Sequence, residues 1–464
     1  MFEIILIVIN LGILGMALLF TIESYREQEP RAPLFGIIGI ILHLMFIPIL
    51  YLSQLAQVVI GCYFSILIAL GFFLLIPGKP KKQNLRGSSG FAVGSVDRFD
   101  ERENVFARNA LKPETEQYKY YYQKHPNQEE RDSKRRSRGS LLETLGRIDN
   151  RLPANVNMVI GSISALDSLE PNSLPAIPKG LEQVKLDPEK ATHIIKSWAK
   201  HIGADLVGVC RVDKRWIYSH RGCISADQHI DQWGKRIEKE LPYAVVVATE
   251  MDHDTMAGAP HTPAIVETMR NYSKGAFIST SLANWFAQMG YQAVANHAAY
   301  YEALMVPLSI DAGLGQLGRL GYTISEKFGP RMRLAAVLTN MPLIPDKPID
   351  LGVDEFCKKC KKCAESCPSK SIPIGDKSID NGLLRWKLND ETCHDYWGKV
   401  GTDCGICMAV CPYSRPNRTL HKAIKLLLKH SKYARFVLPH MDNMIYGRRW
   451  KPRKVPSWLD FRTN

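Results

Sequence analysis

The stretch CKKCKKCAESCP, from Cys357 to Pro368, decides how this 464-residue chain is organised. Its cysteines follow the spacing Cys-x2-Cys-x2-Cys-x3-Cys-Pro, which is typical of thiolates that ligate [4Fe–4S] clusters. A second, wider set follows, and its last cysteine again precedes a proline: Cys393, Cys404, Cys407 and Cys411. Zinc ribbons use paired Cys-x2-Cys motifs and lack the three-cysteine run closed by Cys-Pro. The spacing therefore favours iron–sulfur clusters over zinc.

Eight thiolates are enough for two [4Fe–4S] clusters in a ferredoxin-like domain. In bacterial ferredoxins the fourth cysteine of a run ligates the other cluster. We therefore expect one cluster to be ligated by Cys357, Cys360, Cys363 and Cys411. The other cluster is expected on Cys367, Cys393, Cys404 and Cys407. The three remaining cysteines are expected to be buried structural thiols: Cys62, Cys210 and Cys223.

The first 78 residues carry three long apolar segments: Phe2–Ile22, Leu34–Leu52 and Leu55–Pro77. Each is close to the roughly 20 residues that a helix needs to cross the hydrocarbon core of a membrane. A signal peptide would have a basic start and no further apolar segments behind it. The sequence therefore predicts three transmembrane helices, as an anchor over residues 1–78.

Basic residues indicate how this anchor is oriented. The first loop carries Arg26 and Arg31, and the exit from the third segment carries Lys79, Lys81 and further basic residues. Cytoplasmic loops are enriched in Lys and Arg. We expect an integral protein of the inner membrane of a bacterium or archaeon, with its remaining domains on the cytoplasmic side.

Charge is distributed unevenly along the chain. The whole chain has 60 Lys and Arg against 46 Asp and Glu, and residues 412–464 contribute 13 against 2 of these. A uniformly basic surface that binds nucleic acid is therefore not indicated. For a tethered chain, attraction to the anionic lipids of the cytoplasmic leaflet is the better interpretation. Residues 79–180 are rich in charge and are expected to form an extended arm or linker.

Residues 181–350 have the patterns of a globular core. Helices are predicted over Pro188–Ile202 and Thr268–Met289, and strands over Ala204–Val212, Tyr243–Thr249 and Ala335–Thr339. Strands that alternate with helices favour an α/β, or α+β, core. The ferredoxin-like domain is placed at 351–420, and a basic segment packing on the core at 421–464.

A glycine-rich loop lies inside this core and carries Gly313, Gly315, Gly318 and Arg319. Gly-x-Gly-x-x-Gly is also a dinucleotide-binding motif. However, no acidic residue follows at the end of a second strand about 20 residues later, as that motif requires. We interpret the glycines as a place where the backbone approaches a large cofactor closely.

Clusters relay electrons and do no bond chemistry, so a reactive centre is expected in the core. At this point the chain resembles the reductive dehalogenases, which depend on cobalamin and iron–sulfur clusters. The resemblance runs from about residue 97 to the C-terminus. It rests on a combination of short segments: Arg98–Arg102, Phe106–Arg108, Gly203–Gly208, Asn271–Ser273, Ile310–Gly315, Phe328–Arg333 and Thr339–Leu343.

The resemblance implies a nitroreductase-like core that holds a base-off corrinoid without a protein ligand from below. It also implies that Tyr272 donates a proton, with Arg331 or Arg333 stabilising the phenolate and Arg331 slightly preferred. A free phenol has a pKa of about 10, and an adjacent guanidinium lowers the pKa of such a group. Asn296 and His297 lie where the family has polar active-site groups.

The implied reaction removes halide from an organohalide and consumes two electrons and one proton. Many members carry a twin-arginine export signal and dock on a separate three-helix anchor protein. This chain has no such signal and begins as though the anchor were fused to it. A separate electron donor is expected, which could be a ferredoxin, a flavoprotein or a quinol-linked protein.

Two alternatives remain at this stage. The first is an enzyme like epoxyqueuosine reductase, which also pairs a corrinoid with two clusters and acts on tRNA. The second is a non-catalytic membrane protein that carries a corrinoid or transfers electrons. The apolar segments and the Tyr272–Ser273 pair argue against the first, and no nucleic-acid partner is expected.

Overall fold

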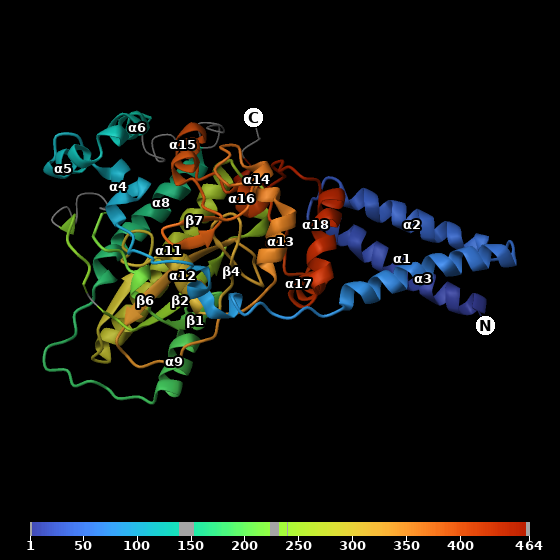
Figure 1. The fold of residues 1–464 in the computed structure, drawn as a ribbon, viewed down its shortest axis with the longest axis horizontal. Coiled ribbons are helices and arrows are strands. Elements are labelled where there is room, and N and C mark those ends of the chain that lie inside the picture. The colour runs from blue at the N-terminus through green and yellow to red at the C-terminus, as the bar shows by residue number, and fades with distance from the viewer. Residues whose placement is uncertain (1, 139–152, 223–231, 239, 461–464) are drawn as a thin grey trace.

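The computed structural model describes residues 2–138, 153–222, 232–238 and 240–460 (Figure 1). Three apolar helices form a bundle that projects from one side of the molecule: α1 (Phe2–Arg26), α2 (Ala32–Ile49) and α3 (Gln54–Leu75). Each is long and apolar enough to cross a membrane. The prediction of three such helices is therefore confirmed.

A polar pair lies inside this bundle. Asn10 Nδ2 donates to the carbonyl of His43 at 2.9 Å, and the Asn10 side-chain oxygen lies 2.7 Å from His43 Nδ1. Such hydrogen bonds between apolar helices satisfy groups that lipid cannot. Cys62 on α3 is exposed, so the prediction that it is buried is wrong because its side of the helix faces outward. Cys210 is buried as expected, whereas Cys223 lies outside the described residues.

The charged arm is helical in large part and is not extended throughout. Its helical elements are η1 (Asn84–Phe91), η2 (Glu101–Glu103), α4 (Val105–Ala110), α5 (Glu116–Lys124), α6 (Pro126–Arg136), α8 (Pro153–Leu169) and η3 (Glu170–Ser173). The prediction differs because several charges are paired and buried within the arm. Asp132 accepts from Arg108 at 2.9 Å and from Arg135 at 2.7 Å, and all three side chains are at most 4% exposed.

The core is an antiparallel four-stranded sheet in the order β1-β2-β6-β3, which makes it α+β. The strands are β1 (Leu206–Arg211), β2 (Tyr243–Glu250), β6 (Met332–Thr339) and β3 (Ala293–Asn296). One face packs on α9 (Pro188–His201) and α11 (Thr262–Gln288). The other face packs on α12 (Met305–Asp311). The alternating apolar residues of the strands therefore form two cores, one on each side of the sheet.

The remaining short elements surround this sheet. They are η4 (Lys214–Trp216), α10 (His253–Met256), and a hairpin of β4 (Gln316–Leu317) and β5 (Thr323–Ile324). The cysteine-rich region contains α13 (Val353–Cys360), α14 (Lys362–Ser366), β7 (Ser378–Asp380), β8 (Leu383–Arg385), α15 (Asp390–Val400), α16 (Ile406–Ala409) and η6 (Pro412–Ser414). The C-terminal segment forms α17 (Thr419–His430), α18 (Lys432–Tyr446) and η7 (Ser457–Leu459).

The C-terminal segment connects the anchor to the rest of the protein. Figure 1 shows α18 lying across the inner end of the apolar bundle, and it contacts α2, α3 and α13. The rings of Tyr433 on α18 and Phe73 on α3 are 4.1 Å apart. Glu27 and Glu29, in the turn between α1 and α2, also pair with this part of the chain. The anchor is thus joined to the core by packing and by ion pairs.

Candidate functional site

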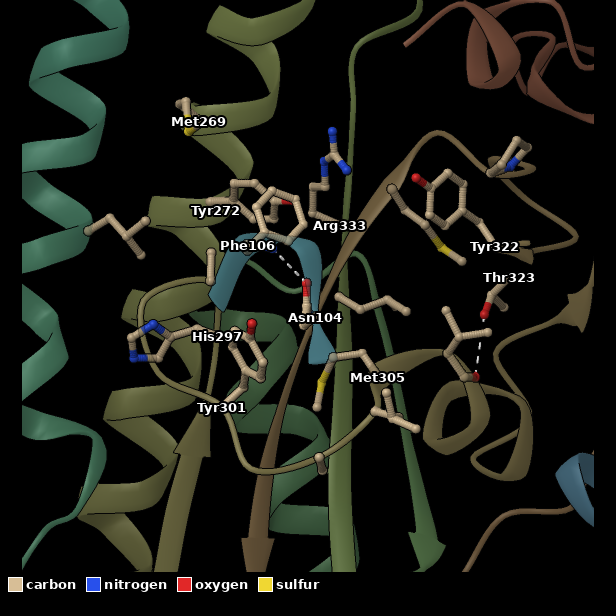
Figure 2. A pocket seen from close by; sticks show the side chains of 18 of the residues that line it. Asn104, Phe106, Met269, Tyr272, His297, Tyr301, Met305, Tyr322, Thr323 and Arg333 are labelled. Carbon is tan, nitrogen blue, oxygen red and sulfur yellow. Dashed lines mark hydrogen bonds between the residues drawn. The ribbon is translucent and has the colours of Figure 1, made fainter. Parts of the chain in front are cut away.

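A cavity of about 570 Å³ lies above one end of the central sheet. Its walls come from α11, the start of β6, the loop after β3 and the arm around α4 (Figure 2). Most lining side chains are apolar, and the polar ones are few: Asn104, Tyr218, Tyr272, His297, Tyr301, Tyr322, Thr323 and Arg333. A mostly apolar cavity with a few convergent polar groups is typical of a binding or active site.

Tyr272 and Arg333 lie next to each other in this cavity (Figure 2). The Arg333 guanidinium carbon is 4.9 Å from the centre of the Tyr272 ring. Arg333 Nη2 donates to Thr268 Oγ1 and to Asp403 Oδ2, each at 2.7 Å. Burial opposes the charge of Arg333, but the nearby oxygens of Tyr272 and Asp403 outweigh it and raise the pKa of Arg333. The structure therefore holds a fixed cation beside the phenol.

Arg331 is turned away from Tyr272 and is tied to backbone. It is 1% exposed, and its Nε donates to the carbonyl of Ser414 at 2.6 Å. It also donates to the carbonyl of Met251 and, at 3.2 Å, to Glu250. The preference for Arg331 over Arg333 is thus reversed by the geometry. Arg331 lies just before β6 and its donors are taken by Ser414, Met251 and Glu250, whereas Arg333 lies within β6 and lines the cavity.

Asn296 and His297 are neighbours in sequence but have different positions. Asn296 is fully buried, donates to the carbonyl of Val294 at 3.0 Å and accepts from the Glu302 amide at 2.7 Å. It does not line the cavity and instead shapes the loop after β3. His297 does line the cavity, and its Nε2 lies 2.9 Å from Ser173 Oγ. Burial lowers the pKa of His297 to about 4, so this imidazole is neutral at physiological pH.

The four cysteines predicted to ligate one of the clusters line a separate cavity that adjoins the cavity containing Tyr272. This smaller cavity is surrounded by all four predicted ligands: Cys367, Cys393, Cys404 and Cys407. Tyr322, Arg333 and Met408 line both cavities. One layer of side chains therefore separates the four thiols from the cavity that contains Tyr272.

The four cysteines predicted to ligate the other cluster are gathered elsewhere in the same domain. Cys363 lies within electrostatic range of Cys357, Cys360 and Cys411, and all four are buried. Among the described residues, no three His, Cys, Asp or Glu side chains converge closely enough to hold a single ion. Ligands placed around a cluster are spread more widely than ligands of one ion. The eight thiols gathered in this domain have the donor chemistry of iron–sulfur ligands, and their pairing into two clusters stays a prediction.

The arm reaches both the large cavity and the helix that carries Cys393. Asn104 and Phe106 line the cavity, and the Phe106 ring is 5.2 Å from that of His394 on α15. Arg108 pairs with Glu391, the first turn of the same helix. These lining residues were outside the predicted site, although Phe106 belongs to a segment that carried the family resemblance.

The glycine-rich loop packs on its own chain and does not line the large cavity. A Cβ at Gly313 would lie 2.6 Å from the carbonyl of Lys347, and one at Gly315 or Gly318 would collide with Ile324. These glycines allow the β4–β5 hairpin to close, which places Tyr322 and Thr323 in the cavity wall. None of these glycines lines the cavity that contains Tyr272, so an approach of their backbone to a cofactor stays a prediction.

Arg319 is fixed to the ferredoxin-like domain. It is 1% exposed and donates to the carbonyls of Cys357, Pro373 and Gly375 at 3.0, 2.7 and 2.7 Å. Its guanidinium also lies 4.5 Å from the centre of the Trp386 ring. Arg319 thus holds the backbone of the first cysteine run and does not line the cavity that contains Tyr272.

Comparison with known proteins agrees with this arrangement. The family model of a 4Fe-4S dicluster domain matches residues 356–414. Tetrachloroethene reductive dehalogenase of Sulfurospirillum multivorans is 34% identical over 308 residues, which cover 60% of this chain and 60% of that protein. Over these 308 residues the chain is similar to a reductive dehalogenase. The tetrachloroethene reductive dehalogenase of Desulfitobacterium hafniense is 29% identical over 292 residues, covering 51% of this chain and 50% of that one.

Solved structures support the same relationship to the reductive dehalogenases. A variant of the catabolic reductive dehalogenase NpRdhA is 26% identical with a TM-score of 0.62, covering 77% of this chain and 47% of that one. A reductive dehalogenase described for B12-dependent dehalogenation is 27% identical with a TM-score of 0.55, covering 66% and 47%. The chain thus spans about half the length of these relatives. Epoxyqueuosine reductase of Lactococcus garvieae matches a shorter segment, 31% identical over 116 residues.

The reductive dehalogenase fold, the ferredoxin-like 4Fe-4S domain and the three apolar N-terminal helices are therefore confirmed. A corrinoid also fits the large cavity by its lining. Met305, Val306 and Leu334 offer an apolar wall for a macrocycle face. His297, the imidazole of this wall, is already bonded to Ser173 and is not offered as a ligand to cobalt.

Proposed function

We propose that the chain is a membrane-anchored reductive dehalogenase that uses a base-off corrinoid and two [4Fe–4S] clusters. One observation carries this proposal. The Tyr272–Arg333 pair faces a cavity whose wall, at Tyr322, Arg333 and Met408, is also the wall of a four-cysteine cavity. A proton donor, an apolar site and an electron relay thus meet at one place.

The proposed reaction converts an organohalide, two electrons and one proton into the reduced product and halide. A cobalamin bound in the cavity would supply low-valent cobalt to reduce the carbon–halogen bond. Tyr272 gives up its hydroxyl proton to the carbon that loses halide. Arg333, held by Thr268 and Asp403, stabilises the phenolate that remains. A positioned acid of this kind contributes about 10²–10⁴-fold to a rate.

The arrangement of the cysteines also indicates the order in which electrons would pass through the two clusters. The cluster on Cys367, Cys393, Cys404 and Cys407 would lie beside the large cavity, because its ligands share that wall. The cluster on Cys357, Cys360, Cys363 and Cys411 would lie farther away, and Cys411 lines a cavity at the junction with the anchor. Electrons from a separate donor would therefore enter at the cluster near the anchor, which Cys411 helps to ligate. They would leave through the cluster beside the large cavity.

We also propose a core fold, domain boundaries and a membrane orientation for this protein. The antiparallel sheet covered by α11 on one face supports a nitroreductase-like core. We place the domains at 1–78, 79–180, 181–350, 351–420 and 421–464. Arg26 and Arg31 favour the cytoplasm as the side that contains the core.

Anaerobic reconstitution tests this function. The full chain, loaded with iron, sulfide and hydroxocobalamin and reduced by methyl viologen, is expected to release halide from members of a panel of aromatic and aliphatic organohalides. Tyr272→Phe should lower turnover at least about 100-fold, because it removes the acidic proton. Its iron content and cluster spectra should stay unchanged.

Tyr291→Phe is the matched control, since it also removes one buried phenol hydroxyl. Tyr291 donates to the carbonyl of Val184 at 3.2 Å and lies outside the cavity lining. Its turnover should remain close to that of the parent chain. Full activity of Tyr272→Phe, or no halide from any substrate in a chain that holds corrinoid and both clusters, would contradict the proposal.

A further inference from the structure

A third cavity lies where the anchor meets the rest of the protein. Its volume is about 320 Å³. Glu29, Pro30 and Arg31 of the turn between α1 and α2 form one wall. The opposite walls come from residues 409–411, from Arg415 and from residues 446–451 after α18. The cavity thus sits at the level where the apolar helices leave the expected membrane.

The lining of this cavity is strongly basic. Seven Lys and Arg side chains line it, against one carboxylate, that of Glu29: Arg31, Lys362, Arg415, Arg448, Arg449, Lys451 and Arg453. Glu29 pairs with Arg415 and Arg453, each at 2.6 Å. Lys362 pairs with Asp442, and Arg448 with Glu365. Positive charge in the lining therefore exceeds the negative charge available to it.

Three of the basic side chains that line the cavity have no carboxylate partner among the described residues. Among the described residues, Arg31, Arg449 and Lys451 take part in no ion pair. In addition, Arg415 Nε and Arg453 Nε are buried donors without an acceptor in the described part of the chain. An unsatisfied buried donor costs free energy, and most so on a charged group. The cavity is therefore suited to an anion with several acceptor oxygens, which guanidinium groups bind well.

Apolar and aromatic side chains next to the cavity would suit the acyl chains of a lipid. Tyr446, in its wall, contacts Phe20 of α1, and the two ring centres are 6.5 Å apart. Phe436 and Met444 on α18 are each 54% exposed. Figure 1 shows α18 running across the inner end of the apolar bundle. A head group in the cavity would thus have its acyl chains beside α1 and the apolar residues of α18.

We propose that this cavity binds the phosphate-bearing head group of an anionic phospholipid. The phosphate joins Arg31 of the anchor to Arg449 and Lys451 of the C-terminal segment. It thereby holds the anchor against the domain that carries Cys411. Basic pockets beside membrane helices are suited to such head groups. The inference rests on the proposed membrane insertion of α1–α3, but not on dehalogenation.

The test uses the full chain in nanodiscs of phosphatidylcholine with or without phosphatidylglycerol. Lipid retention is measured by native mass spectrometry, and the thermal midpoint of unfolding in parallel. Phosphatidylglycerol should raise the midpoint of the parent chain. The double variant Arg449→Gln/Lys451→Gln should retain this lipid about 25-fold less, at about fivefold for each cation. Both side chains are exposed, so the fold should persist.

Lys454→Gln is the control, because Lys454 is an exposed neighbour that does not line the cavity. It should retain phosphatidylglycerol like the parent chain. Equal retention by the double variant and the control would overturn the proposal. So would full stabilisation by inorganic phosphate in detergent with no added effect of the lipid. Stabilisation by the hydroquinone menadiol, without any by phosphatidylglycerol, would likewise overturn it. None of these readouts requires turnover, so failure here is distinguishable from failure of the proposed activity.

Discussion

Replacing Arg108 by Gln should loosen the helix that carries Cys393. Arg108 is 4% exposed at its side chain and donates to Asp132 at 2.9 Å. It also pairs with Glu391 at the start of α15 and donates to the carbonyl of Glu103 at 2.5 Å. Breaking a buried ion pair by removing one partner costs about 3–5 kcal/mol.

The lower end of that range is expected here. In the variant, Asp132 still forms an ion pair with Arg135 at 2.7 Å and accepts a hydrogen bond from Tyr122 at 3.0 Å, so its charge remains compensated. Glu391 also keeps Arg135. We therefore expect about 3 kcal/mol, which corresponds to roughly a 150-fold change in a local opening equilibrium. Because α15 supplies only one ligand of one cluster, the loss should be selective.

Native-state hydrogen exchange measures this opening directly. Amides of residues 390–400 should exchange about 100-fold faster in Arg108→Gln than in the parent chain. The cluster predicted on Cys367, Cys393, Cys404 and Cys407 should be lost first, which would reduce the iron content toward half. The spectrum of the other cluster should remain.

Arg131→Gln is a matched control on the same interface. Arg131 pairs with Asp395 at 3.1 Å, but its side chain is 46% exposed. Exposed ion pairs contribute about 0–1 kcal/mol, so exchange in α15 should change less than about fivefold. If both variants behave alike, or if Arg108→Gln keeps its exchange rates and its iron, then the arm does not hold Cys393 in place.

Two further predictions concern the cavity. Arg333→Lys should lower viologen-driven halide release at least about 10-fold with both clusters intact, because Lys cannot reproduce the paired contacts to Thr268 and Asp403. Arg331→Lys should instead lower the thermal midpoint of unfolding. If Arg331→Lys and Arg333→Lys lowered turnover equally without any loss of stability, the different roles given to the two arginines would be contradicted. Burial lowers the pKa of His297 from 6.5 to about 4. Between these pH values the imidazole is protonated in the unfolded chain and neutral in the folded chain. The stability linked to His297 is therefore complete above pH 6.5 and is lost as the pH falls toward 4, by about 3 kcal/mol. His297→Gln should flatten this part of the thermal midpoint against pH, and an unchanged slope would refute it.

The sequence alone determined those features that depend on local spacing and composition. Eight cysteines at ligand spacing predicted the ferredoxin-like domain, because ligands close in the chain can surround a cluster whatever the rest of the fold does. Uninterrupted apolar runs predicted the three helices of residues 1–78, because their length is matched to a membrane. Tyr272 was indicated by its resemblance segment and not by any local pattern.

Only the tertiary structure decided which side chains meet. Arg333, and not Arg331, lies beside Tyr272, because Arg331 is held by the carbonyls of Ser414 and Met251. Long-range ion pairs fold the charged arm onto α15, although its composition favoured an extended linker. The glycines at 313, 315 and 318 pack on neighbouring backbone and side chains, since their partners come from residues 323–347. In the first two cases the deciding contacts join residues that are distant in sequence, and burial gives those contacts their strength.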